Sequence, residues 1–192
     1  MTMLTKRFAS AVALSLLATT LGLAQQEHQP RGKAETTIGG KKVVIEYGRP
    51  ALKGRTLDEL MKDLPQDRVW RACENQVTTL TTETALSIGG TKIPAGKYSL
   101  YVHAPAAGDW SLCVNKNLGI PLIQLWDKAP PNMANEPWPM LNGYQADKEV
   151  ARIKMKKSAG QAGDIFSIAI KGDELTLSWA DATWGTTIQA GS

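Results

Sequence analysis

Alternating apolar and polar residues recur in short stretches along most of the chain. Residues 97–103 place Tyr98, Leu100 and Val102 on one side and Ser99, Tyr101 and His103 on the other. Residues 110–115, 151–156 and 166–179 repeat this alternation. Since successive side chains of a strand point to opposite faces, the pattern predicts a series of β-strands that each bury one face.

Paired glycines mark turns between these strands. Gly39-Gly40 separates residues 35–38 from 42–47, and Gly89-Gly90 separates residues 84–88 from 92–93. Both pairs predict hairpins, because glycine readily adopts the positive φ angles of a two-residue hairpin turn. Many short strands with turns between them favour a single-domain antiparallel β-sandwich, jelly-roll-like, over residues 35–190.

Two stretches depart from strand spacing. Thr56 and Glu59 form the capping-box pattern of a helix N-terminus. The apolar residues that follow share one helical face (Leu57, Leu60, Met61 and Leu64), and Pro65 ends the short helix.

The second departure, residues 120–144, holds five of the ten prolines, and we expect a long ordered loop there. Its rings, Trp126, Trp138 and Tyr144, either fold the loop onto the sandwich or form a platform for sugars or a partner protein.

The first 24 residues have the pattern of a signal peptide. Lys6 and Arg7 precede an apolar stretch that is too short to span a bilayer, and small residues stand at positions 22 and 24. We therefore expect an exported protein, periplasmic or secreted, with no transmembrane segment after cleavage. Residues 25–34 are polar and without periodicity, which indicates a flexible lead-in.

The composition excludes several kinds of site. The net charge of +4 falls to +2 without the leader, because 20 basic residues then face 18 acidic ones, and this does not indicate nucleic-acid binding. With only two histidines and two cysteines, we expect no metal site and no cofactor. In an oxidising compartment Cys73 and Cys113 either form a disulfide or remain two half-buried thiols.

The best candidate binding site is a set of donors on either side of the predicted helix. It consists of Arg49, Lys53, Arg55, Trp70, Arg71 and Asn75. Guanidinium groups hold carboxylates or phosphates bidentately, so convergence of these residues predicts a pocket for a polar or anionic ligand or an envelope component. Alternatively, Arg49 and Arg71 pair with Glu46, Asp58, Glu74 or backbone carbonyl oxygens and fix a long loop onto the sandwich.

Tyr101 and His103 are further candidate ligand-binding residues, because they share a strand face and could line a cleft. His103 could serve as a general base with a nearby carboxylate, which is the basis of an alternative function as an envelope hydrolase. No carboxylate stands at a spacing that marks an orienting partner, and no nucleophile-elbow motif occurs. We therefore assign no catalytic residue. Arg152, Lys154, Lys156 and Lys157 are interpreted as a solvated basic strand face.

Residues 45–55 and 69–79 together resemble a bacterial family known as domain of unknown function 2911. The resemblance rests on Tyr47, Arg49-Pro50, Lys53-Gly54-Arg55, Trp70-Arg71 and Asn75, and it continues through residues 88–101, 110–116 and 142–156. It implies an exported single-domain protein without an assigned activity. Cys73 stands where the family pattern has glycine, and residues 120–141 resemble an insertion.

Three functions are consistent with the sequence. We expect a non-catalytic binding or envelope-interaction module; the envelope hydrolase and a purely structural scaffold are the alternatives.

Overall fold

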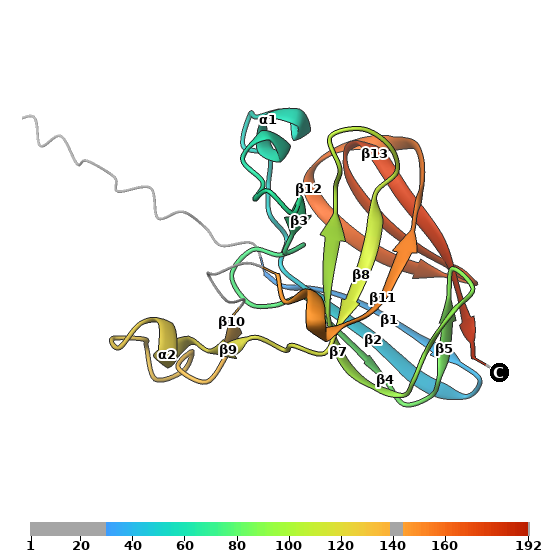
Figure 1. Ribbon diagram of the computed structural model, residues 1–192, viewed down its shortest axis with the longest axis horizontal. Helices are drawn as coiled ribbons and strands as arrows, with labels where there is room; N and C mark the ends of the chain where they lie inside the picture. Colours follow the sequence, from blue (N-terminus) through green and yellow to red (C-terminus); the bar gives the residue numbers. More distant parts are fainter. Residues whose placement is uncertain (1–29, 139–143, 192) are drawn as a thin grey trace, which may run out of the picture.

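The computed structural model describes residues 30–138 and 144–191, which form a β-sandwich (Figure 1). The larger sheet contains β1 (Gly32–Ile38), β2 (Lys41–Tyr47), β4 (Thr79–Thr82), β7 (Gly96–His103), β8 (Ser111–Asn115) and β11 (Glu149–Lys154) in this order, and β3 (Val69–Trp70) pairs with β7. The smaller sheet has the order β12 (Lys156–Lys171), β13 (Glu174–Ala190), β5 (Leu86–Ile88) and β6 (Thr91–Ile93). Neighbouring strands run antiparallel, as the sequence predicts.

Both predicted glycine hairpins are confirmed. β1 and β2 pair up to Ile38 and Lys41 across Gly39 and Gly40, whose φ angles are 59° and 74°. β5 and β6 meet in the same way across Gly89 and Gly90. The first strand begins earlier than expected, so the predicted lead-in is wrong for residues 32–34, while residues 25–29 lie outside the described part. Gly32 pairs with Tyr47, and this strand partner accounts for the order there.

The apolar side chains of both sheets meet in one core. It includes Ile45, Leu100, Val102 and Leu112 from the larger sheet and Ile88, Leu175 and Leu177 from the smaller one. Two pairs of rings stack in this core: Trp110 lies on Trp184 at 3.8 Å between centroids, and Trp70 lies on Trp179 at 5.1 Å.

The central strands β7 and β8 bury both faces, so the expectation of one buried face is wrong for them. Chain segments that follow β8 and precede β11 cover the outer face. The Ser99 hydroxyl donates to the carbonyl oxygen of Asn117 at 2.6 Å, and the Asn115 side-chain amide donates to that of Gln145 at 2.8 Å. Burial on both faces therefore comes from long-range contacts that the alternation does not contain.

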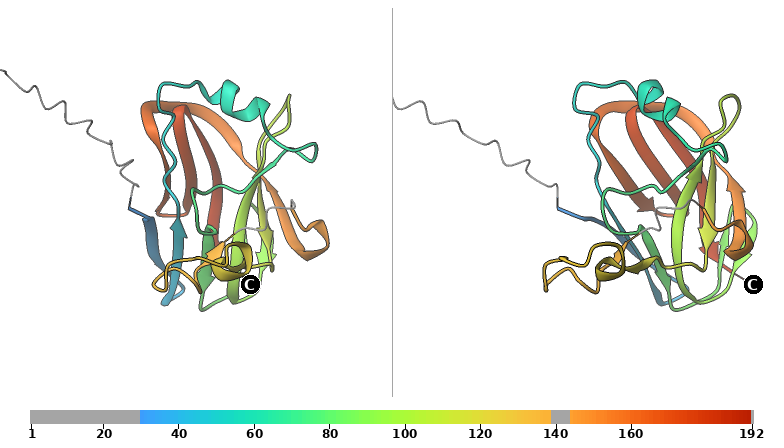
Figure 2. Two further views of the ribbon diagram at one scale, coloured as in Figure 1. Left: turned by 90° about the vertical axis from the view of Figure 1, so that its left-hand side faces the viewer. Right: turned by 60° about the vertical axis from the view of Figure 1, so that its left-hand side comes forward.

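The predicted helix is confirmed as α1 (Leu57–Lys62), with its capping box. The Thr56 amide donates to the Glu59 carboxylate at 2.8 Å, and the Glu59 amide donates to the Thr56 hydroxyl at 3.2 Å. Met61 is buried, and Leu57, Leu60 and Leu64 pack against the core. As a result α1 lies across one end of the sandwich (Figure 2).

The proline-rich segment is not a plain loop. Residues 120–138 form an arm made of β9 (Ile120–Pro121), the short helix α2 (Leu122–Leu125) and β10 (Pro137–Trp138), with β9 and β10 paired. The arm projects from the sandwich (Figures 1 and 2), and Trp126 at its end is 49% exposed. Tyr144, by contrast, packs onto the sandwich, where its ring lies against that of Tyr101. Residues 139–143 lie outside the described residues.

Candidate functional site

A small pocket forms where the chain leaves β2 and meets the loop of residues 71–76. At Gly48 a Cβ atom would lie 2.3 Å from both the backbone nitrogen and the carbonyl oxygen of Glu74. Since no side chain fits in that space, glycine is required for this approach of two backbones. The approach places Arg49, directly after Gly48, beside Asn75.

The 71–76 loop is held in an unusual conformation. Ala72 and Asn75 have φ angles of 47° and 65°, in the left-handed region that costs free energy for residues other than glycine. The Thr78 hydroxyl compensates by donating a 2.6 Å hydrogen bond to the Ala72 carbonyl oxygen. Asn75 is thus fixed by local geometry at the wall of the pocket.

We call this cavity the Arg49 pocket; it has a volume of about 230 Å³. Its polar side chains come from Arg31, Arg49, Glu74, Asn75 and Gln76, and Met133 of the arm closes one side. Arg31 donates to the carbonyl oxygens of Gln76 and Val77 at 3.2 and 2.9 Å. Two guanidinium groups, two side-chain amides and one carboxylate therefore line a space large enough for a small polar molecule.

Within the described residues neither arginine of the pocket forms an ion pair, although the Glu74 carboxylate also lines the cavity. Burial lowers the pKa of Arg31, and Glu46 and Glu136 act in the opposite direction, but a guanidinium remains charged at neutral pH. In the described part of the chain, no carboxylate forms an ion pair with Arg49. Among the described residues, the carboxylate form of the predicted loop-pinning alternative thus has no partner for Arg49, and the form with backbone carbonyl partners stays a prediction.

A family model described as a protein of unknown function (DUF2911) matches residues 29–188. This chain belongs to the DUF2911 family. The match confirms the resemblance seen in the sequence, and the described fold lies almost wholly within it. No curated protein matches the chain, and no solved structure matches it.

In this DUF2911 protein the other predicted binding residues do not converge on the Arg49 pocket. Arg55 lies at the α1 end of the sandwich, where its Nε donates to the Leu52 carbonyl oxygen at 3.0 Å. The Lys53 amide donates to Asp164 at 3.2 Å, and the Lys53 side chain is exposed. Arg71 is also exposed. Of the six predicted residues only Arg49 and Asn75 line this pocket, because the Leu52 and Lys53 amides tie the chain after Arg49 to Asp164 of β12.

Trp70 belongs to the core and not to a ligand platform. Its ring contacts those of Trp179 and Phe166, at centroid distances of 5.1 and 5.0 Å, and these two rings also contact each other. Because β3 pairs with β7 so that Trp70 faces Val102, the side chain points toward the sandwich interior.

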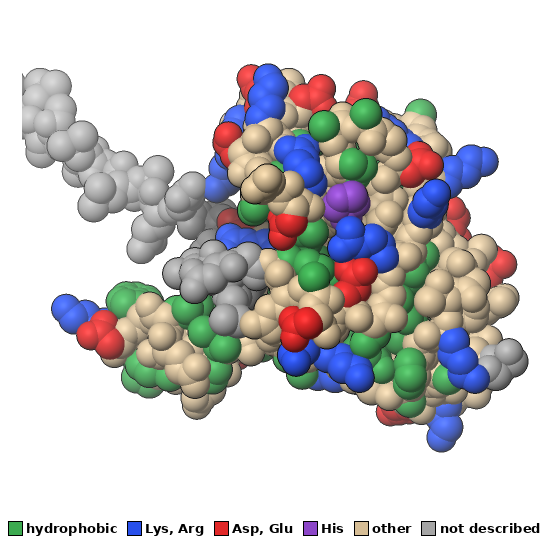
Figure 3. All heavy atoms as spheres, viewed as in Figure 1, with side chains coloured by type: hydrophobic (Ala, Val, Ile, Leu, Met, Phe, Trp, Pro, Cys, Tyr) green, Lys and Arg blue, Asp and Glu red, His purple; other side chains and the backbone are tan. Residues whose placement is uncertain are grey.

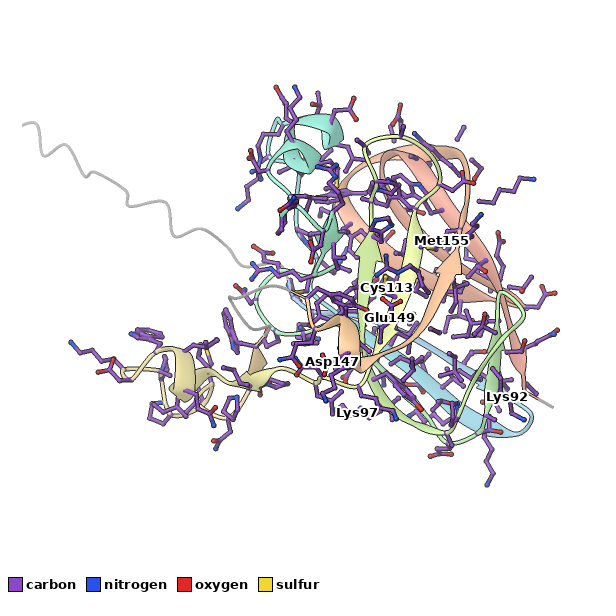
Figure 4. The ribbon with its side chains drawn as sticks, viewed as in Figure 1. Lys92, Lys97, Cys113, Asp147, Glu149 and Met155 are labelled. Carbon is purple, nitrogen blue, oxygen red and sulfur yellow. The ribbon has the colours of Figure 1, made fainter. Side chains whose placement is uncertain are left out.

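A second polar group lies on the outer face of β7, β8 and β11. We call it the Glu149 cluster, and it consists of Tyr101, His103, Cys113, Tyr144, Glu149 and Arg152. Arg152 donates to the Glu149 carboxylate through Nε at 3.1 Å and Nη2 at 2.8 Å. The rings of Tyr101 and Tyr144 meet edge to face at 5.0 Å, and Figure 4 shows Cys113 near Glu149.

Partial burial opposes ionisation of Glu149, but the hydrogen bonds from Arg152 and Tyr144 outweigh it, so that the pKa of this carboxyl is lowered. In this cluster every charge is matched by a direct partner, which is typical of a structural network.

Within residues 30–138 and 144–191, His103 forms no ion pair with an acidic side chain that could orient it as a general base. Burial and the charge of Arg152 lower its pKa, and Asp67 and Glu149 act in the opposite direction through space. No described carboxylate forms an ion pair with its ring. Figure 3 shows the histidine (purple) on the surface with basic and acidic side chains near it. The hydrolase alternative stays a prediction without a hydrogen-bonded acid to orient the imidazole.

Several residues of these sites escaped the sequence analysis. Arg31 lies in the segment expected to be flexible, where no periodicity signals a role. Arg152 was expected on a solvated basic face, and strand alternation would place Glu149 on the opposite face from it. A bulge between Glu149 and Ala151 shifts the register and brings both side chains to one face.

Both cysteines are free and buried, so of the two alternatives left open by the sequence the structure has two thiols and no disulfide between Cys73 and Cys113. Cys73 directs its sulfur to the Asn75 carbonyl oxygen at 3.8 Å within its own loop, whereas Cys113 lies in the middle of β8 beside Glu149. Burial raises the pKa of Cys73 to about 11 and that of Cys113 to about 12.

Residues 30–138 and 144–191 contain neither a cluster of metal ligands nor a helix suited to span a membrane. No group of three or more histidine, cysteine or acidic side chains there has the arrangement of a metal site. No helix in this part of the chain is both long and apolar enough to cross a membrane.

Proposed function

We propose that this protein is an exported, non-catalytic binding module that holds a small polar anion in the Arg49 pocket. The observation that carries the proposal is the convergence of Arg31 and Arg49 on one cavity, with Asn75 as an additional donor and acceptor. A carboxylate or a phosphate group suits this pocket, because the Arg49 guanidinium can donate two parallel hydrogen bonds to such oxygens. Arg31, which already donates to two backbone carbonyl oxygens, adds a second positive charge.

The construction of the pocket favours binding over catalysis. Gly48 and the left-handed residues of the 71–76 loop fix its walls, so little conformational entropy is lost when a ligand enters. Glu74 is the acidic residue of the described lining, and no serine, cysteine or histidine stands there to form a nucleophile–base pair with it. The signal-peptide pattern of residues 1–24 supports export.

A thermal-shift screen of carboxylates, phosphate, nucleotides, sugars and metal ions tests the proposal. A ligand at 100 times its Kd stabilises a protein by about 2.7 kcal/mol, which is a readily measured shift of Tm. We expect a response to small carboxylates or to phosphate. Arg49→Gln should abolish this response, whereas Lys171→Gln, which removes the same charge from an exposed turn, should keep it.

The proposal fails if no anion shifts Tm. It also fails if Arg49→Gln and Lys171→Gln weaken the response equally, because the effect would then come from net charge alone.

A further inference from the structure

A groove runs beneath α1, at the end of the sandwich where Arg55 lies. It has two chambers with volumes of about 830 and 570 Å³. The first lies between the start of α1 and the bulged part of β12 and β13, and the second lies between α1 and residues 104–108. Leu57, Asp58 and Lys157 line both chambers, so they form a neck between them. We call this feature the α1 groove.

The walls of the groove are fixed by the fold. The capping box holds the first turn of α1, and the apolar face of the helix packs on the core. On the opposite side the ladder of β12 and β13 changes register on both sides of Gly163, and Ala180 has a φ angle of 54°. Small residues line this bulge and leave the space open: Ala162, Gly163, Ala180 and Ala182.

The two chambers carry opposite net charges. The first has more acidic side chains, with Asp58, Asp164 and Asp181 against Arg55 and Lys157. The second has more basic ones, with Lys62, Arg68 and Lys157 against Asp58. In the described part of the chain none of these residues forms an ion pair, so neither excess is neutralised from within.

The charges and the buried rings that line the groove exclude several ligand classes. A polyphosphate or nucleotide would meet the three aspartates of the first chamber, and a hydrocarbon chain would desolvate charges at both ends. A sugar needs an open aromatic face, but Trp110 and Trp184 stack on each other and are only 9% and 2% exposed. A ligand for the whole groove must be extended, polar and of opposite charge at its two ends.

We propose that the α1 groove binds a short unmodified peptide, with its amino terminus in the acidic chamber and its carboxylate in the basic chamber. Asp164 and Asp181 face the ammonium group, and Lys62 and Arg68 face the carboxylate. At the neck the Lys157 amine donates to a peptide carbonyl oxygen, while the Asp58 carboxylate accepts from a peptide N–H. This site is separate from the Arg49 pocket and does not depend on the function proposed for it.

The Lys157 side chain is well placed for its role at the neck. Its amine lies 5.8 Å from the centroid of the Trp184 ring, a cation–π distance that restrains the flexible side chain. Arg68 is restrained as well, because it donates to the carbonyl oxygens of Met61 and Ala104 at 2.8 and 3.1 Å. Two cations of the basic chamber are therefore held in position before a ligand arrives.

Calorimetric titration with three forms of tetra-alanine tests the proposal. The peptide with free ends should bind about tenfold more tightly than its N-acetylated form and about tenfold more tightly than its C-terminal amide, because each block removes one charge-assisted contact. Asp181→Asn should remove the preference for a free amino terminus only, and Lys62→Gln the preference for a free carboxylate only. Asp173→Asn and Lys171→Gln, on an exposed turn, are the matched controls.

Three results would each overturn the proposal. The first is no binding of the free peptide at about 10 mM. The second is equal affinity for the free and blocked forms. The third is an equal loss in Asp173→Asn and Asp181→Asn. All four substitutions are at exposed positions, so the variants should fold, and their thermal unfolding verifies this.

Discussion

The Tyr144 hydroxyl group donates a hydrogen bond of 2.5 Å to the Glu149 carboxylate. Arg152 binds the same carboxylate from β11, so one acidic side chain joins Tyr144 to the larger sheet. The tyrosine ring in turn covers Tyr101. This contact explains why the central strands have no solvated face.

Tyr144→Phe should lower the free energy of unfolding by about 2 kcal/mol, because it removes a hydrogen bond to a charged group from a partly buried site. Urea denaturation measures the change. In combination with Glu149→Gln the losses should be strongly non-additive, since both substitutions break one contact. Additive losses would show that the two side chains do not interact.

The stabilising effect of Glu149 should depend on pH. In the folded protein the pKa of the Glu149 carboxyl lies below the ordinary value of 4.5 that it has in the unfolded chain. Its contribution to the free energy of unfolding is therefore fully present above pH 4.5 and is lost as the pH falls through the folded-state pKa. The difference in unfolding free energy between the wild type and Glu149→Gln should therefore be constant at neutral pH and shrink below pH 4.5. A difference that grows on acidification would contradict the assigned hydrogen bonds.

Gly48→Ala should disturb the Arg49 pocket strongly. The added Cβ would lie 2.3 Å from the Glu74 backbone, which has no flexible atoms to move aside. We expect a loss of about 1–3 kcal/mol in thermal or urea unfolding, as for other overpacked sites. Gly163→Ala is the control, because its Cβ would meet nothing closer than 3.8 Å and should change stability by less than about 0.5 kcal/mol.

Both thiols should be unreactive in the native protein. Burial raises the pKa of Cys73 to about 11 and of Cys113 to about 12, so little thiolate exists at pH 8. We expect no reaction with a disulfide reagent such as DTNB until the protein is unfolded in guanidinium, and then two thiols per chain. Fast labelling of the native protein, or no thiol after unfolding, would contradict the structure.

Local sequence signals predicted much of the fold. The Gly-Gly hairpins and the capping box were correct because each depends on backbone preferences within a few residues. The predictions that failed concern contacts between residues far apart in the chain. Residues 120–138 were expected to form a loop, yet the pairing of Ile120 with Trp138 builds an arm, and a pair so distant in the chain leaves no local pattern.

The candidate site was predicted only in part. The sequence identified Arg49 and Asn75 correctly as neighbours, but it also grouped Arg55 and Arg71 with them, although Arg55 lines the α1 groove and Arg71 is exposed. It gave no indication of Arg31. Residue types show which groups can bind an anion, whereas the distance between them depends on how the loops cross.

The sequence by itself thus determined the β-sandwich, the hairpins, the position of α1 and the family of the chain. The tertiary structure decided which charges converge. The alternation of apolar and polar residues and the capping box depend on residues close together in the chain, so the sequence alone reveals them. The close packing of Gly48 on Glu74 and the bulge that turns Glu149 toward Arg152 are contacts between segments, and they exist only when the sheets have formed.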